Sequence, residues 1–258
     1  MNLNQIAELV DTAALDANEI PQLSQAGSEL TLEQAYEVQA LSLKRRYERG
    51  EVPLGIKMGF TSRAKMVQMG LDEMIWGRLT DKMLIEDGGE IDLEDYVHPR
   101  VEPEIAFLMK RDLSGKVSPL QALEAVEAIA PAIEIIDSRY KAFKFNLPDV
   151  VADNTSSSSL VVGQWARPDM EISNLGMVME FDGKTVEIGS SAAILGHPVR
   201  ALAGASALLA EQGLALKAGW ILMAGGATAA VPLMPGINVR LSVQNLGRVN
   251  FSVKAAQV

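Results

Sequence analysis

The most informative segment of the chain is His98-Pro99-Arg100-Val101-Glu102-Pro103-Glu104-Ile105-Ala106-Phe107-Leu108. Its apolar residues, after a proline near the start, predict a β-strand. Side chains two residues apart in a strand point to the same face, so Glu102 and Glu104 are expected to stand side by side. Ile105 and Phe107 then lie on the opposite face. Two carboxylates at that distance repel each other unless a proton or a cation lies between them.

A third carboxylate lies in a second apolar segment, Ala132-Ile133-Glu134-Ile135-Ile136, which is also strongly β-forming. A buried carboxylate among apolar neighbours is costly and implies a partner. Three carboxylates without accompanying histidine or cysteine suit a hard cation such as Mg²⁺ or Mn²⁺. The alternative interpretation is that Glu102 and Glu104 line a solvated strand face. Glu134, with isoleucine on both sides, favours the metal.

Composition limits the class of protein. The 258 residues suffice for one large domain or a domain with a small appendage, and 48% hydrophobic with 22% charged residues is typical of a soluble globular protein. A net charge of −10 argues against nucleic acid as a partner. The sequence has no membrane-span pattern and no signal-peptide pattern, so we expect no membrane association and a cytoplasmic location. The absence of cysteine excludes disulfides and thiolate sites.

The periodicity of apolar residues divides the chain in two. Helical spacing over residues 2–17, and a capping box at Thr31-Leu32-Glu33-Gln34 before a second helix, predict a small N-terminal helical region over residues 1–53. Residues 54–258 are expected to form a β-rich, metal-binding catalytic domain. Scattered helices among many short strands predict an α+β fold with a rolled or sandwiched sheet, rather than a doubly wound α/β fold.

Local patterns predict the elements of the second region. They are a strand at 54–59, a helix at 63–69, a loop-rich stretch at 71–87 with turns at Trp76-Gly77 and Thr80-Asp81, an alanine-rich helix at 118–130, a serine run at 156–159, hairpins around Asp182-Gly183 and Asn245-Leu246-Gly247, a helix that His197 caps, and a strand at 220–224. Lys141 and Lys144, with two neighbouring phenylalanines, predict a solvated basic-aromatic face.

Three further features are candidates for a site. Lys57, between Gly55 and Gly59, can approach a ligand because glycine exposes the backbone, or it can be an edge-strand lysine that opposes aggregation. The serine run is either a plain loop or a source of hydroxyls for an anionic ligand. His98 lacks a serine or cysteine nucleophile to activate, so a hydrolase triad is not expected, and its role stays open.

Four motifs, taken together and in order, resemble one family over essentially the whole chain. They are Gly55-Ile56-Lys57-Met58-Gly59, Glu102-Pro103-Glu104, Glu134-Ile135-Ile136-Asp137-Ser138-Arg139 and Val151-Ala152-Asp153-Asn154. The family is the hydratase/decarboxylase branch of the fumarylacetoacetate hydrolase superfamily. The resemblance implies a mixed β-roll, homo-oligomers, and Mg²⁺ (or Mn²⁺) on Glu102, Glu104 and Glu134. It also implies catalytic roles for Lys57 and Asp81, and substrate-binding roles for Ser156, Asp153, Arg139 and Gly225.

Three features are similar to the decarboxylases of this branch: Lys57-Met58-Gly59 with Ala64-Lys65-Met66, residues 140–145, and residues 225–232. The activity implied is metal-dependent decarboxylation of 2-oxohex-3-enedioate, a small 2-oxo dicarboxylic acid, in the meta-cleavage catabolism of aromatic compounds. A complex with the pathway's dienoate hydratase is implied too. The alternatives are hydration of 2-hydroxypenta-2,4-dienoate, and a metal-bound protein that binds small acids without turnover.

Overall fold

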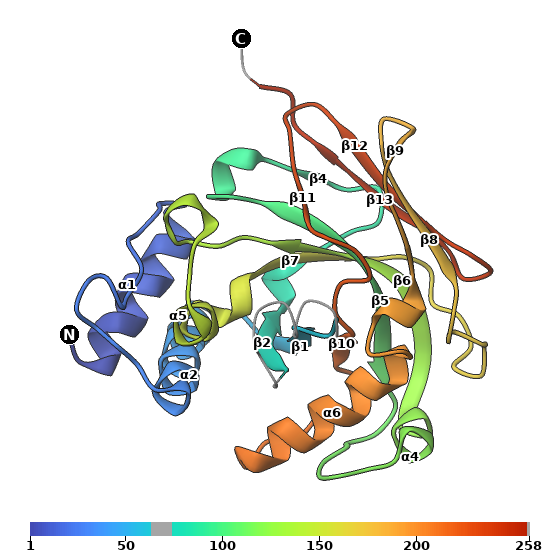
Figure 1. The fold of residues 1–258 in the computed structure, drawn as a ribbon, viewed down its shortest axis with the longest axis horizontal. Helices are drawn as coiled ribbons and strands as arrows, with labels where there is room; N and C mark the ends of the chain where they lie inside the picture. The colour runs from blue at the N-terminus through green and yellow to red at the C-terminus, as the bar shows by residue number, and fades with distance from the viewer. Residues whose placement is uncertain (63–73, 257–258) are drawn as a thin grey trace.

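The computed structural model of the protein describes residues 1–62 and 74–256. Its strands form two sheets (Figure 1). The larger sheet has the order β2-β1-β10-β5-β6-β7-β3, with β11 also paired to β5, and the smaller has the order β4-β13-β12-β8-β9. The strands are β1 (Pro53–Gly59), β2 (Ile75–Thr80), β3 (Leu84–Ile85), β4 (Glu90–Ile91), β5 (Arg100–Met109), β6 (Val126–Ile136), β7 (Ser157–Val162), β8 (Gly176–Phe181), β9 (Lys184–Ser190), β10 (Ile221–Met223), β11 (Val231–Pro232), β12 (Asn238–Val243) and β13 (Gly247–Val253).

Helices cover the ends of these sheets. They are α1 (Leu3–Leu15), α2 (Leu32–Glu48), α4 (Pro119–Leu123), α5 (Leu147–Ala152) and α6 (Pro198–Glu211), with short 3₁₀ turns η1 (Asp81–Met83), η2 (Leu93–Asp95), η3 (Lys141–Phe143), η4 (Asn154–Ser156) and η5 (Ser191–Ala193). Figure 1 shows α1, α2 and α5 together on one side, and α4 and α6 below the long strands β5 and β6. The α+β class with a rolled sheet, expected from the sequence, is confirmed.

The antiparallel pair β5 and β6 forms the centre of the molecule. The two strands pair along their whole length, with Glu102 opposite Glu134. Ile105 and Phe107 are fully buried, in one hydrophobic core with Phe251 of the smaller sheet. The alternation read from the sequence therefore holds: one face of β5 packs into the core between the sheets while the other carries carboxylates.

The N-terminal helices share a hydrophobic cluster with later parts of the chain. Capping boxes begin both helices, at Asn2 and at Thr31. Buried residues of α1 and α2 cluster with Ile75, Tyr140 and Val151. The division of the chain after residue 53 stays a prediction.

The apolar segment around α6 is a core helix. Ser191–Glu211 is long and apolar enough to cross a membrane by length and composition. The α6 residues Leu202, Ala205 and Leu209 are at most 1% exposed and belong to the main hydrophobic core. His197 caps this helix as expected, because its Nδ1 accepts a hydrogen bond from the Val199 N–H at 3.2 Å.

Two local predictions are wrong, because strand pairing overrides local propensity, and one of two alternatives for the serine run is excluded. The stretch 71–87 was expected to be loop-rich, but Trp76 and Gly77 lie within β2, which pairs with β1. The alanine-rich helix expected to reach residue 130 ends at Leu123, because β6 begins at Val126 and pairs with β5 on one side and β7 on the other. The serine run is mostly β7 rather than loop. The helix expected at 63–69 lies outside the described residues.

Gly77 provides a test of the packing between β2 and η4. A Cβ at residue 77 would lie 2.4 Å from the Asn154 carbonyl oxygen and 2.4 Å from Ser157 Oγ. Gly77→Ala should therefore lower the free energy of unfolding by about 1–3 kcal/mol, the usual cost of overpacking, as measured by urea denaturation. Gly176→Ala is the matched control, because its Cβ would meet Gln244 Oε1 at an ordinary 3.5 Å. Equal stability of the two variants would contradict this account of the packing.

Candidate metal centre and adjoining pocket

Three carboxylates meet on the face of β5 and β6 that points away from the core. Glu102, Glu104 and Glu134 each offer an oxygen, and these oxygens all lie within 4.8 Å of one another. Glu104 and Glu134 are at most 1% exposed, and Glu102 is half-buried. The expectation that Glu102 and Glu104 share a strand face with Glu134 nearby is confirmed by the strand register.

The surroundings of these carboxylates are asymmetric. Glu104 Oε2 accepts a hydrogen bond from the Gly225 N–H at 2.7 Å, but none of the described residues supplies a hydrogen-bond partner for the buried Glu104 Oε1. Lys57 Nζ lies 2.9 Å from Glu134 Oε1 and donates a hydrogen bond to its Oε2 at 3.1 Å. One ammonium group therefore accompanies three carboxylates, and a buried carboxylate oxygen remains unpartnered, which is costly.

Burial makes this negative charge difficult to hold. Burial raises the pKa of Glu104 well above its usual value, and repulsion from Glu134 adds to the shift. Burial also raises the pKa of Glu134, against the opposing effect of Lys57. A hard divalent cation removes both problems, since it binds carboxylate oxygens and keeps the groups ionised. The donor set and the unpartnered oxygen of Glu104 therefore fit a divalent metal ion.

Two consecutive glycines are needed beside the carboxylates, one for the close approach of Thr61 and the other for that of Glu102. Gly225 has a φ of +102°, and a Cβ there would lie 2.0 Å from Thr61 Oγ1. A Cβ at Gly226 would lie 2.7 Å from Glu102 Oε2. Gly225 was predicted to bind substrate, and in the structure its N–H holds Glu104.

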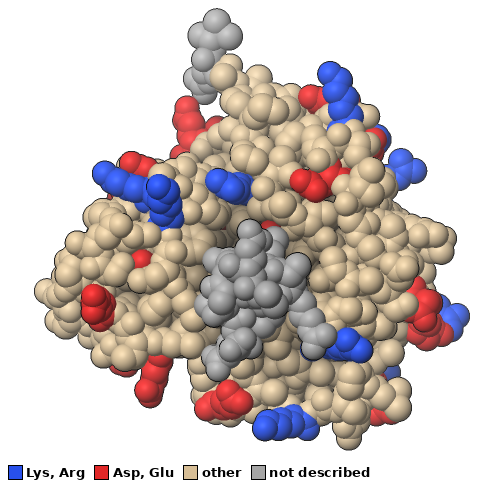
Figure 2. All heavy atoms as spheres, viewed as in Figure 1, with Lys and Arg blue, Asp and Glu red and all other residues tan. Residues whose placement is uncertain are grey.

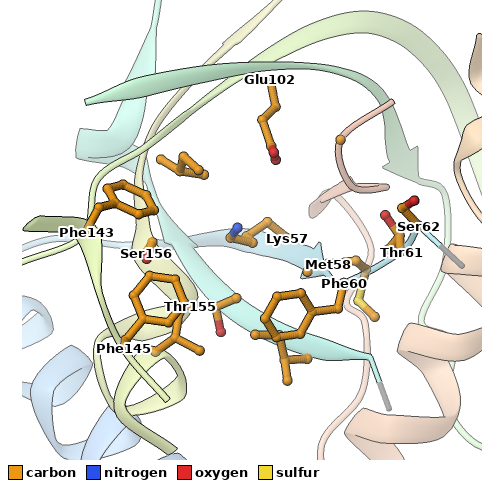
Figure 3. Close-up of a pocket in the computed structure, with 15 residues that line it drawn as sticks. Lys57, Met58, Phe60, Thr61, Ser62, Glu102, Phe143, Phe145, Thr155 and Ser156 are labelled. Atoms are coloured by element: carbon orange, nitrogen blue, oxygen red, sulfur yellow. The ribbon is translucent and has the colours of Figure 1, made fainter. Parts of the chain in front are cut away.

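A pocket with a volume of about 110 Å³ adjoins the carboxylates. Figure 3 shows Glu102 and Lys57 pointing into it, with Phe143, Phe145 and Phe60 around the opposite side. We call this opposite side the apolar wall, and define it by the three rings that Figure 3 labels there, Phe60, Phe143 and Phe145. Ile75, Ile136 and Val150 also line the pocket. The pocket thus has a charged end and an apolar end.

Ser156 lines the same pocket on an unusual turn. Asn154, Thr155 and Ser156 have φ values of 49°, 55° and 56°, which non-glycine residues rarely adopt. Asn154 holds the turn to β2, because its side chain bonds both the N–H and the carbonyl of Arg78 at 2.8 and 2.9 Å. Ser156 Oγ is buried and has no hydrogen-bond partner within residues 1–62 and 74–256. Backbone strain of this kind persists where the surroundings enforce it, often at functional sites.

The structure does not bring three predicted site residues to the pocket. Asp81 is exposed, and its carboxylate accepts a hydrogen bond from the Val52 N–H at 2.7 Å. Arg139 and Asp153 form a buried ion pair with each other. Arg139 also donates to the Asp153 carbonyl oxygen at 2.7 Å. The side chains of Arg139 and Asp153 hold the chain just before the Ser156 turn and do not line this pocket, and the roles predicted for these three residues stay predictions.

The sequence interpretation missed the aromatic part of the site. Phe143 and Phe145 were assigned to a solvated face with Lys141 and Lys144, but both rings line the pocket. The signal available in the sequence was their spacing of two residues directly after the Glu134 motif. His98, whose role was open, places its ring edge-on to Phe143, with centroids 6.4 Å apart.

Comparison with known proteins agrees with this geometry. Residues 62–254 match the family described as fumarylacetoacetate (FAA) hydrolase C-terminal. The chain belongs to the fumarylacetoacetate hydrolase family. It is 59% identical over 252 residues to a 4-oxalocrotonate decarboxylase from Pseudomonas sp., and the aligned residues cover 98% of each chain.

Two further relatives are informative. The solved structure of 4-oxalocrotonate decarboxylase from Pseudomonas putida G7, complexed with magnesium and adipate, has a TM-score of 0.94 to this chain, at 39% identity and with 97% of each chain covered. A 2-hydroxyhexa-2,4-dienoate hydratase from Comamonas testosteroni is 33% identical, with 91% of each chain covered. The resemblance inferred from the four sequence motifs is confirmed.

The raised pKa of Glu104 predicts proton release when a cation binds. A proton held above the usual pKa must leave before the carboxylate can bind metal, so the affinity for Mn²⁺ should fall as the pH falls through that raised pKa. Calorimetric titration in two buffers of different ionisation enthalpy should give different heats. Glu104→Gln is the control and should reduce both the difference in heat and the affinity. Identical heats in the two buffers for the unmodified protein would contradict the prediction.

Proposed function

We propose that this chain is a 4-oxalocrotonate decarboxylase, a carboxy-lyase that converts (3E)-2-oxohex-3-enedioate to 2-hydroxypenta-2,4-dienoate and CO₂ in the meta-cleavage catabolism of aromatic compounds. The observation that carries the proposal is the buried carboxylate cluster beside a pocket that holds Lys57, in a chain 59% identical to such an enzyme over 98% of its length. The features that a metal-assisted decarboxylase needs, a carboxylate cluster for the cation, a substrate pocket and a cationic side chain, thus lie together.

Mg²⁺ is the cation proposed for Glu102, Glu104 and Glu134, with Mn²⁺ as the alternative. Support comes from the oxygen-only donor set and from the relative that was solved with magnesium. When bound, the cation supplies Lewis-acid polarisation of the substrate's 2-oxo group and favours negative charge on its oxygen. The C1 carboxylate and the 2-oxo group therefore belong at the charged end of the pocket.

The reaction moves one pair of electrons along the conjugated chain. The bond between C5 and the C6 carboxylate breaks, and its electron pair forms the C4=C5 double bond. The former C3=C4 pair becomes C2=C3, and the carbonyl pair passes to the C2 oxygen, which then takes one proton. The products are CO₂ and 2-hydroxypenta-2,4-dienoate.

The residues of the pocket fit these charge movements. Lys57 lies beside Glu134 and contributes positive charge where the dianionic substrate binds and where charge develops on the C2 oxygen. Ser156 offers a hydroxyl without a partner in the structure, and it donates to a substrate oxygen in this proposal. A Schiff base is redundant, since the cation already favours charge on the carbonyl oxygen.

Hydration of 2-hydroxypenta-2,4-dienoate is the second candidate function. The observation that favours it is the 33% identity to a dienoate hydratase, over 91% of each chain. The same carboxylates and Lys57 would serve that reaction. The higher identity to a decarboxylase makes decarboxylation the preferred function.

The proposed oligomeric state, location and partner follow from the resemblance of the sequence motifs to the family, and the charge of the chain bears on one excluded partner. We propose a homo-oligomer in the cytoplasm that associates with the dienoate hydratase of its pathway, because the dienol product is unstable. Figure 2 shows basic and acidic side chains in separate small groups on the face in view, rather than one continuous basic surface. Together with the net charge of −10, this distribution does not favour nucleic acid as a partner.

The activity predicts loss of substrate absorbance and release of CO₂ from 2-oxohex-3-enedioate. Both should stop in EDTA and return when Mg²⁺ or Mn²⁺ is added, because the carboxylate cluster holds the cation. Purified 2-hydroxypenta-2,4-dienoate, supplied as substrate, should yield little 4-hydroxy-2-oxopentanoate. Rapid hydration of that dienol without CO₂ release from the diacid would reverse the assignment.

The electrostatic role of Lys57 gives a separate prediction. Lys57→Ala should lower kcat about a hundredfold to a thousandfold, which corresponds to roughly 3–4 kcal/mol of transition-state stabilisation. Lys57→Arg should retain more activity, because it keeps the positive charge, although its planar group differs in shape. Treatment with borohydride during turnover should leave the mass of the protein unchanged. A reduced substrate adduct on Lys57, found by mass spectrometry, would show a Schiff-base mechanism instead.

A further inference from the structure

The apolar wall lies where the far end of the substrate must go. The charged end of the pocket holds Glu102 and Lys57, and Figure 3 shows the rings of Phe143 and Phe145 across the pocket from Glu102. Among the described residues that line the pocket, Lys57 is the one with a positive charge, and it is paired with Glu134. The rest of the described lining consists of hydroxyl side chains (Thr61, Ser62, Thr155 and Ser156) and of aromatic and aliphatic side chains. A substrate with its 2-oxo end at the carboxylates and its chain directed across the pocket places its C6 carboxylate beside Phe143 and Phe145.

The position of Phe143 is enforced by its surroundings. Ala142 and Phe143 both have a φ of 56°, in a turn closed by hydrogen bonds from Phe143 N–H to the Tyr140 carbonyl and from Lys144 N–H to the Lys141 carbonyl. The Cζ atom of Arg100 lies 4.2 Å from the centroid of the Phe143 ring. Phe145 lies with its ring centroid 5.7 Å from that of Phe143. A ring held in a backbone conformation that phenylalanine rarely adopts is typical of a functional position.

We propose that Phe143 and Phe145 form the compartment for the departing carboxylate, and that its apolar character selects decarboxylation. The proposal rests on the proposed function and names the specificity-determining residues for it. The compartment admits a carboxylate on the chain of a 2-oxo acid without neutralising it, and it accommodates the CO₂ that leaves.

The physical reason is the direction in which charge moves. Breakage of the C5–C6 bond turns a carboxylate into neutral CO₂, while the electron pair ends on the C2 oxygen at the charged end of the pocket. Apolar surroundings raise the energy of the carboxylate in the bound substrate, and this cost disappears as the charge leaves. Binding energy at the charged end offsets the cost in the ground state.

Arg100 supplies the competing explanation, in which a cation recognises the C6 carboxylate. Its guanidinium contacts Phe143, but Arg100 does not line the pocket. In our proposal Arg100 supports the ring and does not bind the carboxylate. The two explanations predict opposite preferences between a ligand that carries a second carboxylate and one that lacks it.

The test compares two ligands that lack the C3=C4 bond and so cannot react. They are 2-oxohexanedioate, with both carboxylates, and 2-oxohexanoate, with an apolar end of the same chain length. Calorimetry on the Mn²⁺-loaded protein should show that 2-oxohexanoate binds at least as tightly as the dianion. Arg100→Met should lower the affinity for both ligands by the same factor. A decrease of tenfold or more in the affinity of Arg100→Met for 2-oxohexanedioate, without a matching decrease for 2-oxohexanoate, would overturn the proposal.

Phe143 is then changed in both directions. Phe143→Lys should favour the dianion over 2-oxohexanoate by about tenfold relative to the unmodified protein, and should lower kcat about tenfold or more while KM falls, because the carboxylate is now stabilised. Phe143→Leu is the matched apolar variant; it should keep the ligand preference, and its kcat should fall less than that of Phe143→Lys. If Phe143→Lys does not fold, as judged by circular dichroism, Phe143→Asn replaces it, since asparagine tolerates positive φ. For Phe143→Asn, kcat should fall while Mn²⁺ affinity stays unchanged.

Failure of this inference is distinguishable from failure of the proposed function. The unmodified protein is first assayed for CO₂ release, and its absence would reject the proposed function without involving Phe143. Given CO₂ release, an unchanged kcat in Phe143→Lys or Phe143→Asn would overturn the compartment. A decrease in kcat that is larger in these polar variants than in Phe143→Leu would support it.

Discussion

The mutual repulsion of Glu102, Glu104 and Glu134 is the constraint on which the rest of the structure depends. The pairing of β5 with β6 places these groups within 4.8 Å, and burial then prevents water from screening them. Lys57 and the Gly225 N–H each relieve one carboxylate. The close approach of Gly226 to Glu102 forbids a side chain there. Much of the larger sheet can thus be understood as support for a concentration of negative charge.

Strand periodicity was sufficient to predict the carboxylates, since alternation in β5 depends on neighbours along the chain. Long-range pairing was beyond the same reasoning. The residues after Leu123 favour a helix locally, yet they form β6 because strands on both sides supply hydrogen bonds. Asp81, which the family resemblance assigned to catalysis, lies at the surface, because β2 carries it away from Lys57 toward Val52. The position of Asp81 in the sequence therefore does not indicate its position in space, because that depends on how β2 pairs with β1.

The other differences between the sequence interpretation and the structure concern Arg139, Asp153 and Phe143. Arg139 and Asp153 look like substrate-binding groups in the sequence, but their mutual ion pair satisfies both charges inside the protein. Phe143 looks like part of a solvated face in the sequence. The left-handed turn that directs its ring into the pocket contains no glycine or asparagine, the residues from which such a turn is usually predicted. Such turns depend on tertiary contacts, here with Arg100 and His98, that local sequence does not specify.

The position of β10 has a consequence for the order in which the protein is made. This strand pairs with β1 on one side and with β5 on the other, so it joins Lys57 to the strand that carries Glu104. Its residues, and Gly225 two positions after them, leave the ribosome long after Lys57 and the three glutamates have been synthesised. A nascent chain that ends before residue 221 has the strands β5 and β6 that bring the glutamates together, but it lacks the strand that joins Lys57 to them. The ammonium group and the Gly225 N–H are therefore added to the carboxylates late in translation.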